Sequence, residues 1–177
     1  IAPLITHQSA KTRTGAAGAV LVFAAVGGDL GVPICIDIGG AAGPTVWEHC
    51  RHLNLLAIDL DGSRATSAKD RSGRLGFRND RARFYWNMRE LLDPDNGYNM
   101  ALPPDDELRA DLCATRWVVT PHGIQMEPKK DVKKRIGRSP DKGEAVIYAC
   151  APDALSRQVH APVPVGAGKS YWGDPPR

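Results

Sequence analysis

Two runs of apolar residues in the first half of the chain predict buried parallel strands. The run Val32–Ile38 is apolar on both faces, interrupted only by Asp37, and the run Leu55–Leu60 follows it. Between them lie a glycine cluster and a predicted helix at Gly43–Leu53. A strand that is apolar on both faces, followed by a glycine turn and a helix, is typical of a parallel strand in an α/β sheet. The pattern therefore predicts the α/β fold class.

Helical periodicity is clearest at Arg78–Leu92. Its recurring positions predict one face that packs on the core, formed by Ala82, Tyr85, Trp86, Arg89 and Leu92. Aromatic side chains among arginines also occur where nucleic-acid bases stack, but at helical spacing a core role is favoured. Upstream, the alanine-rich stretch Thr14–Val26 predicts a buried helix, after a short apolar run at Ile1–Thr6.

The pattern in the second half of the chain predicts a hairpin, and the amino-acid composition changes near the end of the chain. Arg116–Thr120 and Gly123–Glu127 are two short strands around a Pro-His-Gly turn, which places His122 in solvent. After Cys150 the proportion of Pro, Gly and Ala rises. We therefore expect one globular domain at residues 1–150 and an extended tail at residues 151–177.

A basic run followed by an acidic helix start lies between residues 126 and 150. Six cationic side chains occur within ten residues: Lys129, Lys130, Lys133, Lys134, Arg135 and Arg138. The sequence Ser-Pro-Asp at 139–141 then begins a short apolar helix that carries Glu144.

This helix start has a structural and a functional interpretation. Ser139 as a cap, Pro140 at the first helical position and acids in the first turn make an ordinary helix N-terminus. Alternatively, Asp141 and Glu144 share one face of that N-terminus, where the helix dipole favours anions. Two carboxylates beside a basic surface would then form the edge of a Mg²⁺ or Mn²⁺ site next to a phosphate-binding surface. The local pattern leaves both interpretations open.

Asp37 is a candidate site residue because of its position in the predicted sheet. It lies at the carboxyl end of the first apolar run, before Gly39 and Gly40. Open α/β sheets bind their ligands in the crevice outside the carboxyl ends of the strands. An aspartate before a glycine turn can equally cap that turn.

Composition limits the remaining possibilities. The 177 residues are 42% hydrophobic and 24% charged, which suits one domain with a sizeable core. The net charge is only +3, so a nucleic-acid surface must come from local clustering. The cysteines show no C-x-x-C spacing and are expected to be reduced core residues. No apolar run approaches the ~20 residues of a membrane span and no signal peptide is visible, so we expect a soluble, intracellular protein.

Several ordered motifs resemble the nuclease domain of large terminase subunits of tailed bacteriophages. The stretch PKKDVKKRIGRSPDKGEAVIYA is similar to the end of that domain, where a basic run precedes S-P-D-x-x-D-A. The residues 37–43, DIGGAAG, resemble a metal-binding strand end with its glycine turn. FRNDRA at 77–82, followed by a tryptophan, resembles the F-x-N-x-R-A-x-x-x-W helix, and LPPDDEL at 102–108 the segment after it. The resemblance spans roughly residues 14–150.

The resemblance implies a ribonuclease H-like mixed sheet flanked by helices, and two-metal hydrolysis of DNA phosphodiester bonds with Mg²⁺ or Mn²⁺. It implies that Asp37 and Asp141 are catalytic and bind metal, and that Glu144, in place of the family's second aspartate, is a further metal ligand. We expect Asp37 and Asp141 to converge on one site. The six cations of the basic run would contact the DNA backbone without reading sequence.

The implied partners are double-stranded DNA, the terminase ATPase domain, the small terminase subunit and the portal, in the cytoplasm of the infected bacterial host. The implied activity is cleavage of concatemeric double-stranded DNA during genome packaging. Two alternatives stay open: a non-catalytic DNA-clamping or portal-docking fragment of the same fold, and a related recombination nuclease.

One departure from the family pattern affects the expected activity. In that family a first metal-binding aspartate lies on the opening strand, well upstream of the position of Asp37. Here none of the residues 1–28 is acidic, and Asp29 lies in a turn. We therefore expect a sheet that lacks its opening strand or strands and a weakly active nuclease.

Overall fold

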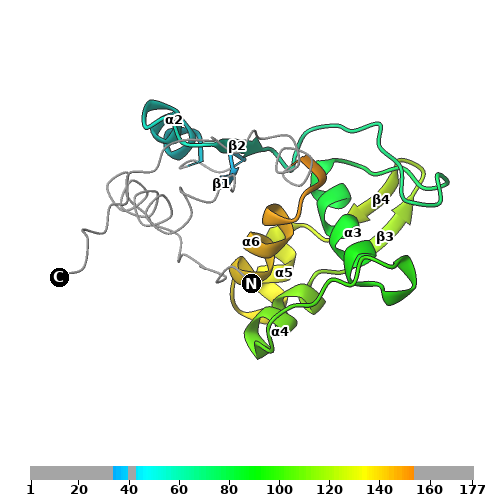
Figure 1. Ribbon diagram of the computed structural model, residues 1–177. Helices are drawn as coiled ribbons and strands as arrows, with labels where there is room; N and C mark the ends of the chain where they lie inside the picture. The colour runs from blue at the N-terminus through cyan, green and yellow to red at the C-terminus, as the bar shows by residue number, and fades with distance from the viewer. Residues whose placement is uncertain (1–33, 40–42, 154–177) are drawn as a thin grey trace, which may run out of the picture.

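Two short parallel strands form the centre of the α/β part of the molecule. The computed structural model describes residues 34–39 and 43–153 (Figure 1). β1 (Ile34–Asp37) pairs with β2 (Ala57–Leu60), with Ile34 opposite Ala57 and Asp37 opposite Leu60. The predicted parallel pair is confirmed. The elements expected before residue 33 and the tail from residue 154 lie outside the described residues.

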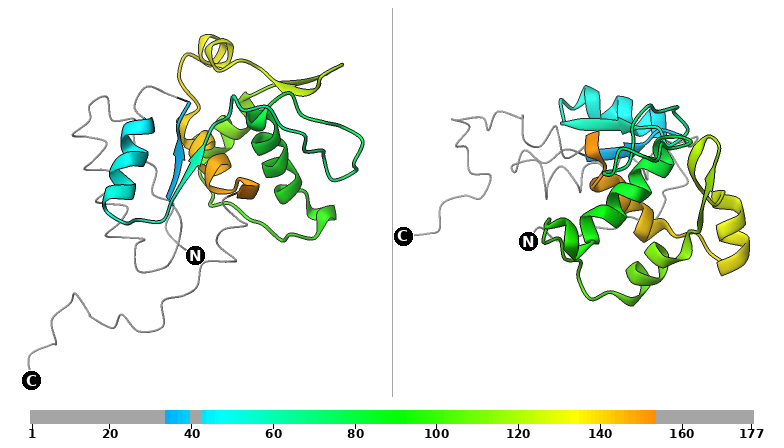
Figure 2. Two further views of the ribbon diagram at one scale, coloured as in Figure 1. Left: turned by 90° about the horizontal axis from the view of Figure 1, so that it is seen from above. Right: turned by 90° about the vertical axis from the view of Figure 1, so that its right-hand side faces the viewer.

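Helices cover the two sides of this pair, as the left view of Figure 2 shows. α2 (Gly43–His52) packs on one side, where Ile36 and Cys50 form a small cluster. α6 (Asp141–Ala149) lies on the other side, where Ile58 and Leu60 join the main core. Side chains alternate along a strand, so each strand supplies both clusters. The sheet is buried by helices on both faces, as expected for parallel strands.

α3 (Asp80–Leu92) lies between two hydrophobic clusters. Asn79 caps it by accepting a hydrogen bond from the Ala82 N–H. Phe84 and Met88 belong to the main core, whereas Ala82 and Trp86 pack against the hairpin. The helix therefore buries two faces. The single predicted face was wrong at its C-terminal end, since Arg89 and Leu92 are exposed.

The hairpin of β3 (Trp117–Thr120) and β4 (Gly123–Met126) forms as predicted, with Trp117 opposite Met126. β4 lies next to Phe77 through an isolated bridge at Ile124. Gly123 has φ of 98°, and a Cβ there would lie 2.4 Å from the Gly76 carbonyl oxygen. Only glycine therefore allows this close approach of the two backbones. His122 is exposed, as expected.

The remaining elements lead to the acidic helix start. A 3₁₀ turn (Pro94–Asn96) and α4 (Asp106–Ala114) precede the hairpin, and α5 (Lys129–Ile136) follows it. Gly137 ends α5 in the left-handed conformation. α6 begins where the sequence predicted, but the expected serine cap is wrong. Pro140 occupies the capping position, so Ser139 instead donates a hydrogen bond to Asp141 Oδ1 at 2.5 Å.

The cysteines and the end of the described chain differ partly from expectation. All four cysteines are free, and Cys50 is fully buried, but Cys113 is exposed on α4 and is not a core residue. Ala151 is buried in the main core and Asp153 forms an ion pair with Arg83, so both pack on the domain. No helix within the described ranges is long and apolar enough to cross a membrane.

Gly143 sets the distance between α4 and α6. A Cβ at this position would lie 2.7 Å from Asp111 Cβ and 3.1 Å from the Asp111 carbonyl carbon. We expect Gly143→Ala to destabilise the fold by about 1–3 kcal/mol, because the two helices must separate. Urea unfolding measures the loss. Gly76→Ala is the matched control, since nothing lies within 4 Å of a Cβ there. Equal stability of the two variants would contradict the close packing.

Candidate active site

Asp37 ends β1 on the side that faces α6. Cys35, two residues earlier on the same face, packs on the main core, and α6 packs against β1. The exposed Asp37 side chain also caps its own turn, because Oδ1 accepts a hydrogen bond from the Gly39 N–H at 2.9 Å. The turn-capping role is therefore present, and it leaves the second carboxylate oxygen available.

Asp61 follows β2 and approaches the same point. A Cβ at Gly39 would lie 3.2 Å from Asp37 Oδ1 and 3.9 Å from Asp61 Oδ1. The Ser63 hydroxyl donates to Asp61 at 2.6 Å, and this bond, with that from the Ser63 backbone, lowers the pKa of the Asp61 carboxyl. The sequence analysis did not identify Asp61 as a site residue. Its place directly after the second apolar run, one residue beyond the partner of Asp37, is the signal that could have identified it.

The first turn of α6 presents Asp141 and Glu144 at different depths. The side chain of Asp141 is 54% exposed and that of Glu144 only 10%. The Lys129 ammonium joins them: it is 3.8 Å from Asp141 Oδ1 and donates a hydrogen bond to Glu144 Oε2. The structure thus brings these two predicted site residues to one cation.

The inner side of Glu144 contacts α3. The Tyr85 hydroxyl donates to Glu144 Oε1 at 3.2 Å, and Arg81 Nη2 lies 3.8 Å from the same oxygen. Burial, more than the nearby Glu144 charge, raises the pKa of Tyr85 to about 12. Sequence reasoning treated Arg81 and Tyr85 only as parts of a helix, because a helical period does not show what a partly buried polar group faces.

Tyr148 connects Asp37 with Glu144. Burial is the main cause that raises the pKa of the Tyr148 hydroxyl, and the negative charges of Asp37 and Glu144 raise it further. A Cβ at Gly62 would lie 2.9 Å from that hydroxyl oxygen. Asp37 of β1 and Glu144 of α6 therefore both act on the partly buried Tyr148, while Lys129 links Glu144 to Asp141.

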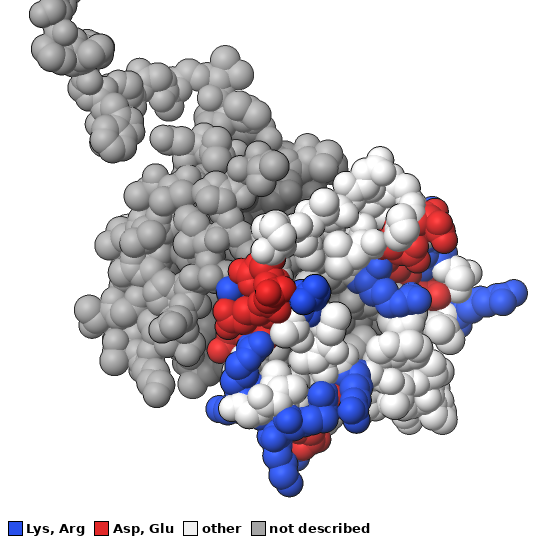
Figure 3. Space-filling view, turned by 90° about the horizontal axis from the view of Figure 1, so that it is seen from below, with Lys and Arg blue, Asp and Glu red and all other residues white. Residues whose placement is uncertain are grey.

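The six cations of the basic run divide into two groups. Lys129 contacts the acids of α6, Arg135 binds Glu127 with Nη2 at 2.5 Å from Oε2, and Arg138 pairs with Asp111. The other three are exposed at positions of α5 that lie on one face, and they form no ion pair within the described part of the chain: Lys130, Lys133 and Lys134. Figure 3 shows basic and acidic side chains interleaved on one side of the molecule. Lys130, Lys133 and Lys134 are thus the exposed cations of α5 that no acid in the described residues neutralises.

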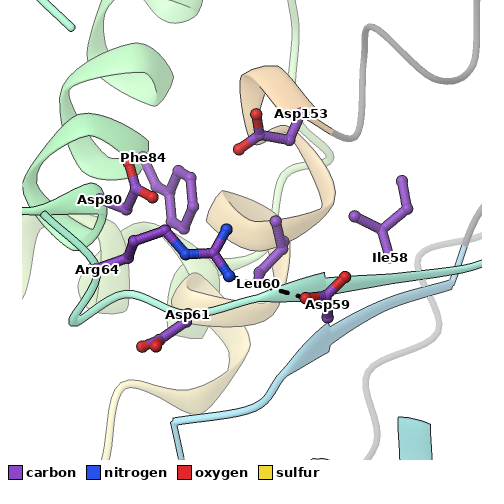
Figure 4. Close-up of a pocket in the computed structure, with 8 residues that line it drawn as sticks. All are labelled: Ile58, Asp59, Leu60, Asp61, Arg64, Asp80, Phe84 and Asp153. Carbon is purple, nitrogen blue, oxygen red and sulfur yellow. Dashed lines mark ion pairs between the residues drawn. The ribbon is translucent and has the colours of Figure 1, made fainter. Parts of the chain in front are cut away.

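An acidic hollow of about 260 Å³ lies beside β2, lined in part by Asp59, Asp61, Asp80 and Asp153 (Figure 4). Arg64 points into it and is 3.8 Å from Asp59. Arg83 pairs with Asp80 at 2.7 Å and with Asp153 at 2.5 Å. Arginines therefore balance its charge, and it includes none of the predicted site residues.

The donor chemistry of the site fits a divalent cation, because Mg²⁺ and Mn²⁺ prefer carboxylate oxygens. The present arrangement holds a cation of the chain itself, the Lys129 ammonium, between Asp141 and Glu144. In residues 34–39 and 43–153, no three His, Cys, Asp or Glu side chains lie close enough together to hold a metal ion. The Lys129 side chain is about half exposed.

The partly buried Tyr85 makes a prediction for alkaline pH. Its folded pKa of about 12 exceeds the ordinary value of about 10. The folded state therefore retains a proton that the unfolded state loses, and stability falls between pH 10 and 12 by up to about 1.4 kcal/mol per pH unit. Tyr85→Phe should make this fall shallower in urea unfolding measured from pH 9 to 12. Tyr98→Phe, at a 52% exposed position, is the control. An unchanged slope for Tyr85→Phe would contradict the buried assignment.

Comparison with known proteins gives one consistent structural match. No family model and no curated protein matches the sequence. The nuclease domain of the large terminase subunit gp2 of bacterial virus Sf6 is similar in structure, with 20% identity, a TM-score of 0.58, and coverage of 78% of this chain and 71% of that chain. A mutant of that domain with manganese gives 19% identity, a TM-score of 0.58, and coverage of 78% and 72%. A mutant of the same large terminase subunit with calcium has 19% identity and a TM-score of 0.57, and the match covers 78% of this chain and 71% of that chain.

These matches confirm the fold that the sequence motifs predicted. At 19–20% identity this structural likeness establishes the fold alone. The described part of the chain has the ribonuclease H-like α/β fold of a terminase nuclease domain, with a partial sheet.

Proposed function

We propose that this chain is the nuclease domain of a phage DNA-packaging terminase and that it cleaves concatemeric double-stranded DNA. The observation that supports the proposal is that α6, whose first turn carries Asp141 and Glu144, packs against β1, whose last residue is Asp37. These acids come from opposite ends of the described chain. Like charges repel, so cations must compensate these acids, and in the present structure Lys129 and Arg81 do so at α6.

Asp37, Asp141 and Glu144 are the residues proposed to hold two divalent cations, Mg²⁺ or Mn²⁺. When bound, such ions supply a polarised water and neutralise charge on the leaving oxygen of a phosphodiester. Asp61 is proposed as a further carboxylate at this edge, since it approaches Asp37 beside Gly39. The chain contributes the negative oxygens and holds them in position.

Lys130, Lys133 and Lys134 are proposed to bind the DNA backbone. They lie on the exposed face of the helix whose first residue, Lys129, contacts the site acids. A duplex held on this face would therefore lie next to the carboxylates. Contacts of this kind fix the position of the duplex without reading its sequence. By the same resemblance, the ATPase domain, small subunit and portal are the proposed protein partners, in the host cytoplasm.

A second candidate function is a DNA-clamping module without cleavage. The pairing of Lys129 with both Asp141 and Glu144 favours it, because an internal cation already neutralises these acids. Both candidates predict DNA binding through α5. They differ in whether Mn²⁺ can replace the ammonium.

Incubation with supercoiled plasmid and millimolar Mn²⁺ distinguishes the two candidates. The nuclease predicts nicked and linear products and a Mn²⁺-binding isotherm, both absent in Asp141→Asn. The clamp predicts a shifted but intact plasmid and no metal binding. Products that persist in Asp141→Asn would indicate a contaminating nuclease and would contradict the proposed site.

A further inference from the structure

We propose that Arg81 is a positioning residue that fixes one oxygen of Glu144 and leaves the other oxygen for the site. This inference rests on the proposed function, because it concerns how a proposed metal ligand is held. Arg81 belongs to the first turn of α3 and its side chain is 17% exposed.

A hydrogen bond, a cation–π contact and polar contacts of Nη2 hold the Arg81 guanidinium in place. Nη1 donates a hydrogen bond to the Glu127 carbonyl oxygen at the end of β4, at 2.8 Å. The guanidinium carbon lies 4.8 Å from the centre of the Tyr85 ring. Nη2 then faces the Tyr85 hydroxyl oxygen at 3.5 Å and Glu144 Oε1 at 3.8 Å. A planar fork can meet these directions together, whereas a lysine ammonium carries its charge at one point.

The backbone around Arg81 leaves space for this arrangement. The Arg81 N–H donates to the Gly62 carbonyl oxygen at 2.8 Å. A Cβ at Gly62 would lie 3.1 Å from Arg81 Cβ and 2.9 Å from the Tyr148 hydroxyl oxygen. Glycine at position 62 therefore allows Arg81 and Tyr148 to approach the site from the same side.

The two oxygens of Glu144 have different surroundings. Oε1 faces the partly buried Arg81 and Tyr85, whereas Oε2 accepts a hydrogen bond from the half-exposed Lys129. A glutamate has one more rotatable bond than an aspartate, so an unanchored glutamate loses more conformational freedom when it becomes a ligand. Arg81 and Tyr85 remove that freedom in advance. Oε2 is the oxygen of Glu144 that lies on the side of Lys129 and Asp141.

The test compares Arg81→Lys and Tyr85→Phe with the parent chain. Calorimetry with Mn²⁺ alone gives metal affinity, and plasmid cleavage gives kcat and KM. We expect Arg81→Lys to weaken Mn²⁺ binding by about 10- to 100-fold and to lower kcat, with KM for DNA changed less than about 3-fold. Tyr85→Phe should also weaken Mn²⁺ binding and lower kcat, but by smaller factors than Arg81→Lys. Arg89→Lys is the matched control, since Arg89 stacks on Trp86 of the same helix and is exposed.

A second comparison uses Glu144→Gln as the background. If Arg81 acts through Glu144, Arg81→Lys has no further effect on Mn²⁺ affinity in that background. Additive losses would overturn the inference, as would an unchanged Mn²⁺ affinity for Arg81→Lys in a chain that binds Mn²⁺.

The proposed function can fail separately. A parent chain that neither binds Mn²⁺ nor cuts DNA would reject the nuclease. The positioning inference is then decided without metal, from urea unfolding midpoints of the two single variants and their combination. Less-than-additive shifts support the contact between Arg81 and Glu144, and additive shifts overturn it.

Discussion

Asp37→Asn is expected to lower Mn²⁺-dependent plasmid cleavage by about 100-fold or more. An amide is neutral, so it can neither balance the charge of a divalent cation nor place it, and loss of one such electrostatic contact has an effect of this size. The fold should be unaffected, because an asparagine oxygen can accept the hydrogen bond from the Gly39 N–H that Asp37 now accepts. Circular dichroism and the urea midpoint check this.

Asp59→Asn is the matched control for that loss. Asp59 lies on β2, lines the acidic hollow and pairs with Arg64, and it is not among the proposed ligands. The Asp59→Asn variant should cleave plasmid at the parent rate. The assay uses enzyme in excess over plasmid, so that slow cleavage by the parent is also detected. Equal cleavage by Asp37→Asn and Asp59→Asn would remove Asp37 from the site.

The second large effect is expected on DNA binding by a triple variant in which Lys130, Lys133 and Lys134 become glutamine. Each phosphate contact contributes about 0.9 to the slope of log affinity against log salt. The parent slope should be about −3 to −5, and the variant should lose about 2 to 3 of it, with roughly 10- to 100-fold weaker binding at 0.1 M salt. Fluorescence anisotropy with a labelled duplex at several salt concentrations measures both quantities.

A control of equal charge change replaces Lys69, Arg74 and Arg78 by glutamine. These residues are exposed on the segment between β2 and α3, and not on α5. If both triple variants lose the same slope, binding follows the overall charge of the chain and not the α5 face. Arg135 is left unchanged, because removing it would also break its ion pair with Glu127.

The fold was largely predictable because its signals are local. Apolar runs, a glycine turn and a hairpin turn act through nearby backbone, so the parallel pair, α2 and the hairpin are confirmed. The end of α3 was less predictable. A helical period assumes one buried face, whereas α3 has a cluster on either side and leaves Arg89 and Leu92 outside both.

The site was predictable only in part, because contacts between distant residues decide it. Asp37, Asp141 and Glu144 are candidates that position and motif suggested, and their role stays a prediction. The role of Lys129 could not, because a run of cations does not show which of them an acid 15 residues later will bind. Arg81, Tyr85 and Tyr148 were missed for the same reason: their importance lies in the burial of polar groups against Glu144.

The position of α3 between two clusters has a consequence for sequence variation. From Asp80 to Met88 every second side chain is buried and those between are partly buried, so nine consecutive positions have no fully exposed side chain. An ordinary surface helix has a polar stripe that accepts many residue types. Here random substitution should be tolerated almost nowhere along two and a half turns, while Arg89, one residue later, accepts most replacements. A library scored for folded protein would show this boundary as an abrupt step within a single helix.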